Sequence, residues 1–206
     1  MSLPRIKICG ITSESAASAA TEAGADALGF IFYSPSPRHL EIERAAAIRQ
    51  SLPPFITPVA VMVNPEAGYV AEIVNKVQVD LLQFHGEEED EFCTSFGRPY
   101  IKAIRISKTV DPAIEENRYP HSCGVLLDTH IANVYGGSGK SFDWEQAHYK
   151  GSKPVILAGG LNPQNVQQAL TISCPYGVDV STGVETCGKK DIQKMIDFCT
   201  AVRNYA

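Results

Sequence analysis

Two ionisable side chains of complementary chemistry, the thiol of Cys9 and the carboxyl group of Asp128, each end a short apolar run of the sequence. A thiolate can accept a proton and a protonated carboxyl group can donate one, so the two could act as a catalytic base and acid if the fold brings them together. Each residue also has a structural interpretation. Cys9 could be a buried thiol, and Asp128 could cap a helix or anchor a loop.

Glycine and hydroxyl residues in two later segments could bind a phosphate group. Gly159 and Gly160 would let the backbone approach an anion closely, and Ser181 and Thr182 could donate hydrogen bonds from their hydroxyl groups. Together with Gly183 and the residues after it, Thr182 could form a brief helical turn whose start faces the anion. The alternative is that these residues are turn glycines and a helix cap.

Three more polar side chains could contact a ligand. Arg38 stands in the proline-rich run SPSPR, and its planar guanidinium could bind a substrate carboxylate through two hydrogen bonds. Gln83 and His85 come at the end of an apolar run and could touch a substrate. A solvated arginine and a structural histidine are the alternatives.

The glycine-rich segment YGGSGKS at residues 135–141 is not a P-loop, because Val134 stands where that motif needs its first glycine. We expect a mobile loop that closes over the site. The second and third strands are expected to end at FY and VN, without a set of His, Asp and Glu side chains. A metal-dependent sugar-phosphate epimerase is therefore disfavoured.

Short β-branched runs alternate with helical patterns from end to end, which predicts repeated βα units and a parallel sheet. We expect eight strands, at residues 5–9, 27–32, 58–63, 80–84, 100–106, 124–128, 154–158 and 176–180. No glycine-rich dinucleotide turn follows the first strand, so an open doubly wound sheet is disfavoured. The prediction is an α/β fold with a single (β/α)8 TIM barrel that forms one domain over residues 1–206.

In such a barrel the active site lies at the C-terminal ends of the strands, where all the candidate residues fall. The first and sixth strands are three steps apart around the ring. Cys9 and Asp128 can therefore face a ligand from opposite sides. Barrels of this kind frequently bind phosphate after strands seven and eight, where Gly160 and Ser181 stand.

Helix boundaries are indicated by a few capping residues. Asn64 and Asn162 each precede a proline and are expected to be N-caps, and Gly24 is expected to stop the first helix. Two segments, residues 110–119 and 143–149, are expected to be single turns. Two helices should bury apolar stripes, one of Val70, Ile73, Val74 and Val77 and one of Ile192, Ile196 and Cys199.

Composition excludes several classes of protein. The 206 residues are 44% apolar and 20% charged, with a net charge of -5, so no basic surface is expected for nucleic acid or an anionic membrane. The start of the chain lacks a signal peptide, and no apolar run approaches the roughly 18 residues of a membrane span, so we expect a cytoplasmic protein. The six cysteines show no metal-ligand spacing, and most are expected to be buried thiols.

Taken together, these residues resemble the phosphoribosylanthranilate isomerase family, small barrel enzymes of tryptophan biosynthesis. The resemblance spans nearly the whole chain and rests on seven motifs in order. They are KICGIT at 7–12, SPR at 36–38, QFHG at 83–86, LD at 127–128, GGSGKSFDW at 136–144, LAGGL at 157–161 and GVDVSTGVE at 177–185. Phe84 and Thr182 depart slightly from the expected Leu and Ser.

The resemblance implies that Cys9 is the general base, Asp128 the general acid and Arg38 the partner of the substrate's anthranilate carboxylate, with the phosphate at Gly160 and at Ser181 and Thr182. It implies an Amadori rearrangement of N-(5-phosphoribosyl)anthranilate to 1-(2-carboxyphenylamino)-1-deoxyribulose 5-phosphate, without a metal or organic cofactor. The expected partner is this small phosphorylated substrate, and the expected assembly is a monomer or homodimer.

Two alternatives remain at this stage. A similar barrel, indole-glycerol-phosphate synthase, would be expected to carry Glu and Lys at the ends of strands one and three, where Cys9 and Val63 stand. A non-catalytic phosphate-binding barrel could keep the glycines but lose the acid and base. The presence of both Cys9 and Asp128 argues against it.

Overall fold

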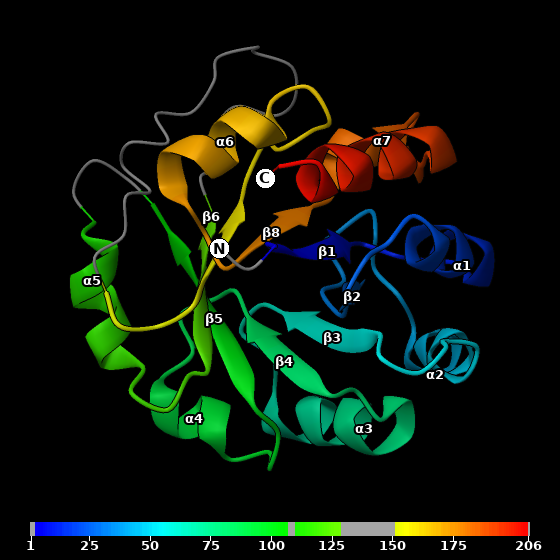
Figure 1. Cartoon of the computed structure of the whole chain (residues 1–206). Coiled ribbons are helices and arrows are strands. Elements are labelled where there is room, and N and C mark those ends of the chain that lie inside the picture. Colours follow the sequence, from blue (N-terminus) through cyan, green and yellow to red (C-terminus); the bar gives the residue numbers. More distant parts are fainter. Residues whose placement is uncertain (1–2, 107–109, 129–150, 206) are drawn as a thin grey trace.

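The computed structural model describes residues 3–106, 110–128 and 151–205. Eight parallel strands form a closed barrel in chain order, with β1 hydrogen-bonded to β8 (Figure 1). The strands are β1 Arg5–Cys9, β2 Ala27–Ile31, β3 Thr57–Met62, β4 Leu81–Phe84, β5 Tyr100–Arg105, β6 Gly124–Asp128, β7 Val155–Ala158 and β8 Gly177–Val180. The predicted TIM barrel is confirmed, and the expected strands agree with these within two residues at each end.

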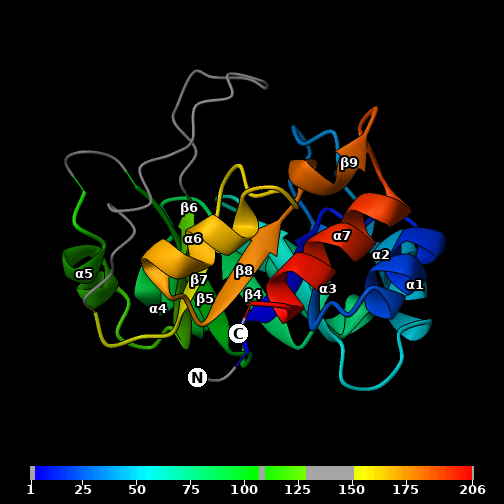
Figure 2. The same ribbon diagram turned by 45° about the horizontal axis from the view of Figure 1, so that its top comes forward.

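Helices surround the barrel, and α7 packs between α1 and α6 (Figure 1). They are α1 Glu14–Glu22, α2 Ile42–Gln50, α3 Ala67–Val77, α4 Asp90–Thr94, α5 Pro112–Glu115, α6 Val166–Ser173 and α7 Ile192–Arg203, with 3-10 turns η1 Glu116–Arg118 and η3 Thr182–Val184. A small antiparallel hairpin of β9 Glu185–Thr186 and β10 Lys189–Lys190 precedes α7. Figure 2 shows β9 raised above the end of the barrel at which β8 ends.

Alternation along the strands separates an outer core from the barrel interior. On β1, Ile6 and Ile8 are fully buried in the main hydrophobic cluster with residues of the surrounding helices. Lys7 and Cys9, which alternate with them, point the other way, because successive side chains of a strand face opposite sides. Cys9 accordingly packs inside the barrel against Val59 and Val61 of β3.

Several helix predictions are confirmed. Gly24 follows α1 with a φ of 103°, a left-handed conformation that glycine adopts without strain. The stripe of α3 is buried as expected. The segment expected as a single turn at 110–119 contains the short α5 and η1. The other one, at 143–149, lies outside the described residues.

Of the two predicted N-caps, Asn64 is wrong, and Asn162 caps the turn that leads into the helix. α3 begins at Ala67 with Glu66 as its N-cap, and the side chain of Asn64 instead accepts a hydrogen bond from the Glu87 amide at 2.7 Å. The N-cap of α6 is Asn165. Asn162 accepts hydrogen bonds from two backbone amides of the preceding turn, so it begins that turn and not the helix.

The predicted stripe of α7 is wrong at two of its three residues: Ile192 and Ile196 are 60% and 40% exposed, and only Cys199 is buried. The helix buries Met195, Phe198, Cys199 and Val202, a stripe of equal helical spacing that offers larger side chains to the barrel. The cysteine prediction fails in part, since Cys123, Cys174 and Cys187 are exposed. Within the described residues, no helix has the length and apolar character needed to cross a membrane.

Candidate active site

The predicted site residues come together at one end of the barrel. Cys9 ends β1 and Asp128 ends β6, which the strand order places three steps apart through β8 and β7. His85 follows β4, and Gly159 and Ser181 follow β7 and β8. Because all strands are parallel, these positions share the C-terminal face, where barrel enzymes carry their chemistry.

The thiol of Cys9 is buried, with 6% of the residue exposed. Charged side chains of both signs lie close to it. Burial raises its pKa, and the nearby carboxylate of Asp179 acts in the same direction. The cations of Lys7 and Lys190 lower the pKa and offset part of this effect. These cations therefore favour the thiolate, whereas burial and Asp179 favour the thiol.

The imidazole of His85 contacts both the carboxyl group of Asp128 and the side chain of Gln83 in the barrel interior. Its Nε2 lies 3.0 Å from Oδ2 of Asp128, and its Nδ1 lies 3.4 Å from the side-chain amide nitrogen of Gln83. Gln83 is 1% exposed, so it supports the imidazole from below, and a ligand above the barrel would meet His85 first. The prediction that Gln83 contacts substrate stays a prediction.

Arg38 forms a two-point ion pair with Glu185 of the β9 strand. Nε and Nη2 of Arg38 each lie 2.8 Å from a carboxylate oxygen of Glu185, and Nζ of Lys190 lies 2.7 Å from the same carboxylate. Burial opposes the charge of Glu185, but the hydrogen bonds from Arg38 and Lys190 prevail and lower its pKa. Glu185 contacts only the Nε and Nη2 edge of Arg38, so, as far as the described residues go, the Nη1 and Nη2 edge could bind a ligand carboxylate.

The loops after β7 and β8 touch each other closely. A Cβ atom at Gly183 would stand 1.8 Å from the carbonyl oxygen of Leu161, so only glycine permits this contact. Gly159 and Gly160 have φ values of 86° and 66°, the left-handed region, and space is open beside Gly160. Ser181 precedes the turn η3, as expected. Backbone amides and hydroxyl groups can thus converge here on an anion.

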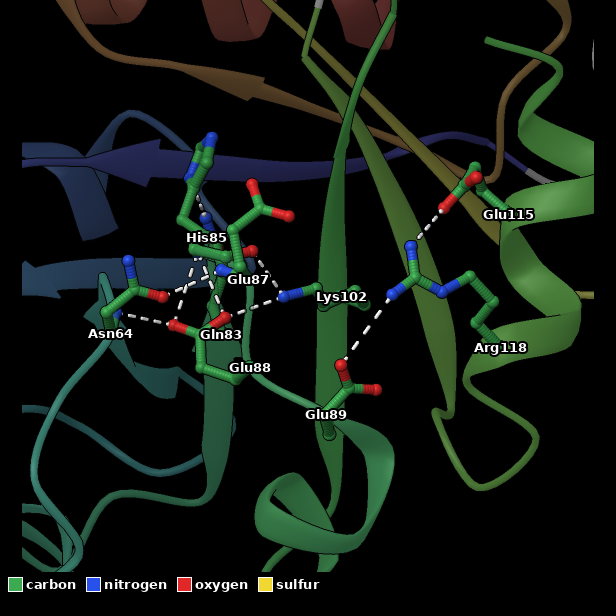
Figure 3. A network of polar contacts seen from close by, with 10 residues as sticks. Asn64, Gln83, His85, Glu87, Glu88, Glu89, Lys102, Glu115 and Arg118 are labelled. Atoms are coloured by element: carbon green, nitrogen blue, oxygen red, sulfur yellow. Dashed lines mark hydrogen bonds and ion pairs between the residues drawn. The ribbon is translucent and has the colours of Figure 1, made fainter.

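A buried ion pair fixes the loop that follows His85. Figure 3 shows Lys102 of β5 reaching towards Glu88, and Nζ lies 2.6 Å from Oε2 of Glu88 and 2.6 Å from the carbonyl oxygen of Gly86. The carboxylate of Glu88 also accepts hydrogen bonds from the amides of Asn64 and Gly86. These contacts hold the chain in place directly after His85.

Sequence reasoning missed four charged residues of the site: Lys7, Asp179, Glu185 and Lys190. A signal was present for the first two. Lys7 stands two residues before Cys9 and Asp179 two residues before Ser181, and residues two apart on a strand share a face. Glu185 and Lys190 pair with each other across a short hairpin, but nothing in the local sequence indicates that Glu185 also binds the distant Arg38.

The fold and this site define a class: a (β/α)8-barrel enzyme with a thiol and a carboxyl group on opposite sides of the barrel mouth and a glycine-rich corner after β7 and β8. The sequence model of the family described as N-(5'phosphoribosyl)anthranilate (PRA) isomerase matches residues 6–201. N-(5'-phosphoribosyl)anthranilate isomerase of Pseudomonas fluorescens (strain Pf0-1) is 49% identical over 98% of this chain and 100% of the relative. The chain belongs to the PRA isomerase family.

Solved structures agree with this assignment. Phosphoribosyl anthranilate isomerase from Thermotoga maritima has a TM-score of 0.89 and 39% identity, over 98% of this chain and 99% of the other. A complex of such an isomerase with reduced 1-(O-carboxyphenylamino)-1-deoxyribulose 5-phosphate has a TM-score of 0.85 and 36% identity, with the same coverage. Monomers generated from the dimeric T. maritima isomerase have a TM-score of 0.83 and 34% identity over 98% and 99% of the two chains.

Proposed function

We propose that this chain catalyses the Amadori rearrangement of N-(5'-phosphoribosyl)anthranilate to 1-(2-carboxyphenylamino)-1-deoxyribulose 5-phosphate, a step of tryptophan biosynthesis. The observation that carries the proposal is the placement of Cys9 and Asp128 on opposite sides of one barrel mouth. An aldose-to-ketose rearrangement needs one group that donates a proton and one that accepts a proton.

Asp128 is the proposed general acid. It gives a proton to the ring oxygen as the bond between that oxygen and C1 breaks, and the nitrogen lone pair forms an iminium ion with C1. The imidazole of His85, 3.0 Å away, holds the carboxyl group in one orientation. The acid must be protonated at the start of the reaction, which requires surroundings that favour its neutral form.

Cys9 is the proposed general base. Its thiolate takes the proton from C2, which the adjacent iminium ion makes acidic, and the electrons of that bond form the C1–C2 double bond of an enolamine. The enolamine then takes a proton at C1 and loses one from the C2 hydroxyl group to give the ketone. Product and substrate are isomers, so the overall reaction consumes no oxidant, reductant or other co-reactant.

Binding is assigned to two further regions. The free edge of Arg38 takes the anthranilate carboxylate, and the phosphate lies at Gly159, Gly160, Ser181, Thr182 and Gly183. The close contact of Gly183 with Leu161 supports this placement, because it brings the loops after β7 and β8 together. His85 is the proposed contact of the ligand on the β4 side.

The test is an assay of the purified chain with N-(5'-phosphoribosyl)anthranilate, followed through the anthranilate chromophore. We expect turnover, and we expect the dephosphorylated analogue to lose much of kcat/KM because phosphate binding positions the substrate. Binding of the substrate without turnover by folded protein would indicate a non-catalytic barrel. Equal turnover of both compounds would remove the phosphate site.

The proposal includes a homodimer and a cytoplasmic location. Phe55 is 99% exposed, in a left-handed conformation with a φ of 72°, and it precedes β3 at the barrel end opposite the candidate site. A single exposed aromatic side chain is not by itself a contact surface, so the dimer rests on the similarity to the dimeric Thermotoga maritima isomerase, and Phe55 is the proposed contact residue. Cell fractionation would test the location.

A further inference from the structure

A buried ion pair lies inside the barrel one layer below Cys9, and the mechanism above does not use it. Nζ of Lys7 lies 2.9 Å from Oδ1 of Asp179, and their side chains are 6% and 10% exposed. The register of β1 and β8 places the two residues side by side. Taking two charges out of water is costly, and a buried ion pair is weak support for stability, so a functional reason for this pair is worth seeking.

The ammonium group of Lys7 and the thiol of Cys9 both lie next to Gly29 of β2. A Cβ atom at residue 29 would stand 2.8 Å from Sγ of Cys9 and 3.1 Å from Nζ of Lys7, so the two atoms lie within about 6 Å of each other. The absence of a side chain at Gly29 makes this approach possible. At such a distance, and with both side chains buried, a cation favours the thiolate form of its neighbour.

In the described part of the chain, the other two cations near Cys9, Lys190 and Arg38, are paired with a carboxylate other than Asp179. Asp179 approaches from β8, Lys190 from β10 and Arg38 from the loop after β2, and each interacts electrostatically with the thiol. Lys190 and Arg38 both bind Glu185. The β3 side contributes only the apolar Val59 and Val61. Among the described residues, Lys7 is thus the cation on the same strand and the same face as the thiol.

We propose that Lys7 is a positioning residue for the general base: Asp179 holds its ammonium group below Cys9, where it is the counter-charge of the thiolate that removes the substrate proton. The role in proton removal rests on the function proposed above. The effect on the thiol does not, because it can be measured without substrate.

The proposal predicts opposite signs for the two members of the pair. Lys7→Met removes the positive charge, so the thiolate loses its counter-charge and the pKa of Cys9 rises. Asp179→Asn removes the competing negative charge and leaves the ammonium group to the thiol, so the pKa of Cys9 falls. A purely structural pair would give no such reversal, since losing either member would disturb the same packing.

The measurement is the rate of alkylation of Cys9 by iodoacetamide as a function of pH, with the modified peptide identified by mass spectrometry. The exposed Cys123, Cys174 and Cys187 are first replaced by Ser. We expect the midpoint to rise by at least about one pH unit in Lys7→Met, a tenfold loss of thiolate at a given pH. It should fall in Asp179→Asn and stay close to the parent value in Lys7→Arg.

Lys102→Met is the matched control. It also removes a buried lysine from a carboxylate partner, Glu88, but on β5 and away from Cys9. Its alkylation midpoint should equal that of the parent. With substrate, Lys7→Met should lower kcat by about tenfold or more and change KM little, and Lys7→Arg should restore part of kcat.

An unchanged midpoint in folded Lys7→Met, or shifts of the same sign in Lys7→Met and Asp179→Asn, would overturn the proposal. If Lys7→Met does not fold, the double variant Lys7→Met with Asp179→Leu, which removes both charges, takes its place. The alkylation midpoint of this double variant must lie above that of Asp179→Asn, which keeps the lysine. The expected shifts in a protein without turnover would contradict the proposed function and leave the role of Lys7 intact. Turnover without those shifts would contradict the role of Lys7 and leave the proposed function intact.

Discussion

At the scale of single residues, the site combines groups that the sequence marks with groups that only the fold reveals. Cys9 and Asp128 stand at strand ends, which makes them visible as candidates. Glu185 and Lys190 become part of the site because the β9 and β10 hairpin carries them to Arg38. No local pattern could predict contacts between residues so far apart in the chain.

Arg38→Met tests the carboxylate contact. The carboxylate is present in ground and transition states alike, so we expect KM to rise far more than kcat falls, by about tenfold or more. The ion pair of Glu185 with Lys190 should keep the hairpin in place in this variant. Steady-state kinetics would check this, and an unchanged KM would remove Arg38 from the substrate site.

At the scale of elements, the strands were predictable and the helix starts were not. A barrel strand leaves a run of β-branched and apolar residues that ends at a loop, and all eight runs could be located. Asn64 and Asn162 have the right residue type for N-caps, but their side chains bind backbone amides of neighbouring loops and turns. Which amide a side chain caps depends on tertiary contacts. Which face of α7 is buried likewise depends on packing, because two stripes of helical spacing could each face the barrel.

The ion pair of Lys102 and Glu88 is expected to stabilise the loop after β4. Lys102→Met leaves the buried carboxylate without its cation, and we expect the free energy of unfolding to fall by about 3–5 kcal/mol. The double variant Lys102→Met with Glu88→Gln should recover part of this loss. Urea denaturation gives these values, and equal stability of wild type and Lys102→Met would show that the pair is not needed.

Gly183→Ala tests the contact between the loops after β7 and β8. The added methyl group would meet the carbonyl oxygen of Leu161, so the two loops must separate and the phosphate donors must diverge. We expect KM to rise about tenfold or more, with the barrel still folded. Gly68→Ala in α3, where space is open, is the control and should leave KM unchanged. A normal KM for Gly183→Ala would place the phosphate elsewhere.

At the scale of the whole molecule, the two ends of the barrel have different roles. The C-terminal end carries the candidate site, and the opposite end presents Phe55. We expect Phe55→Glu to shift the protein from dimer to monomer, because a charge in an apolar contact is left without a partner. Ile114→Glu, at another exposed apolar residue, should not. Sedimentation velocity would distinguish the two states, and a wild-type monomer would contradict the dimer.

The central claim, that Cys9 and Asp128 are base and acid, is tested most directly by the pH dependence of kcat/KM in wild type and in folded Cys9→Ala and Asp128→Asn. If chemistry limits the rate, wild type should give a bell-shaped profile. The thiolate fraction of Cys9, and with it the rate on the acidic limb, increases with pH, and because burial raises the pKa of Cys9 this increase extends to higher pH than for a free thiol. Each variant should lose roughly 10²–10⁴-fold in kcat, with the acidic limb absent in Cys9→Ala and the basic limb absent in Asp128→Asn. Near-native turnover by folded Cys9→Ala would contradict the account and assign the base to another residue.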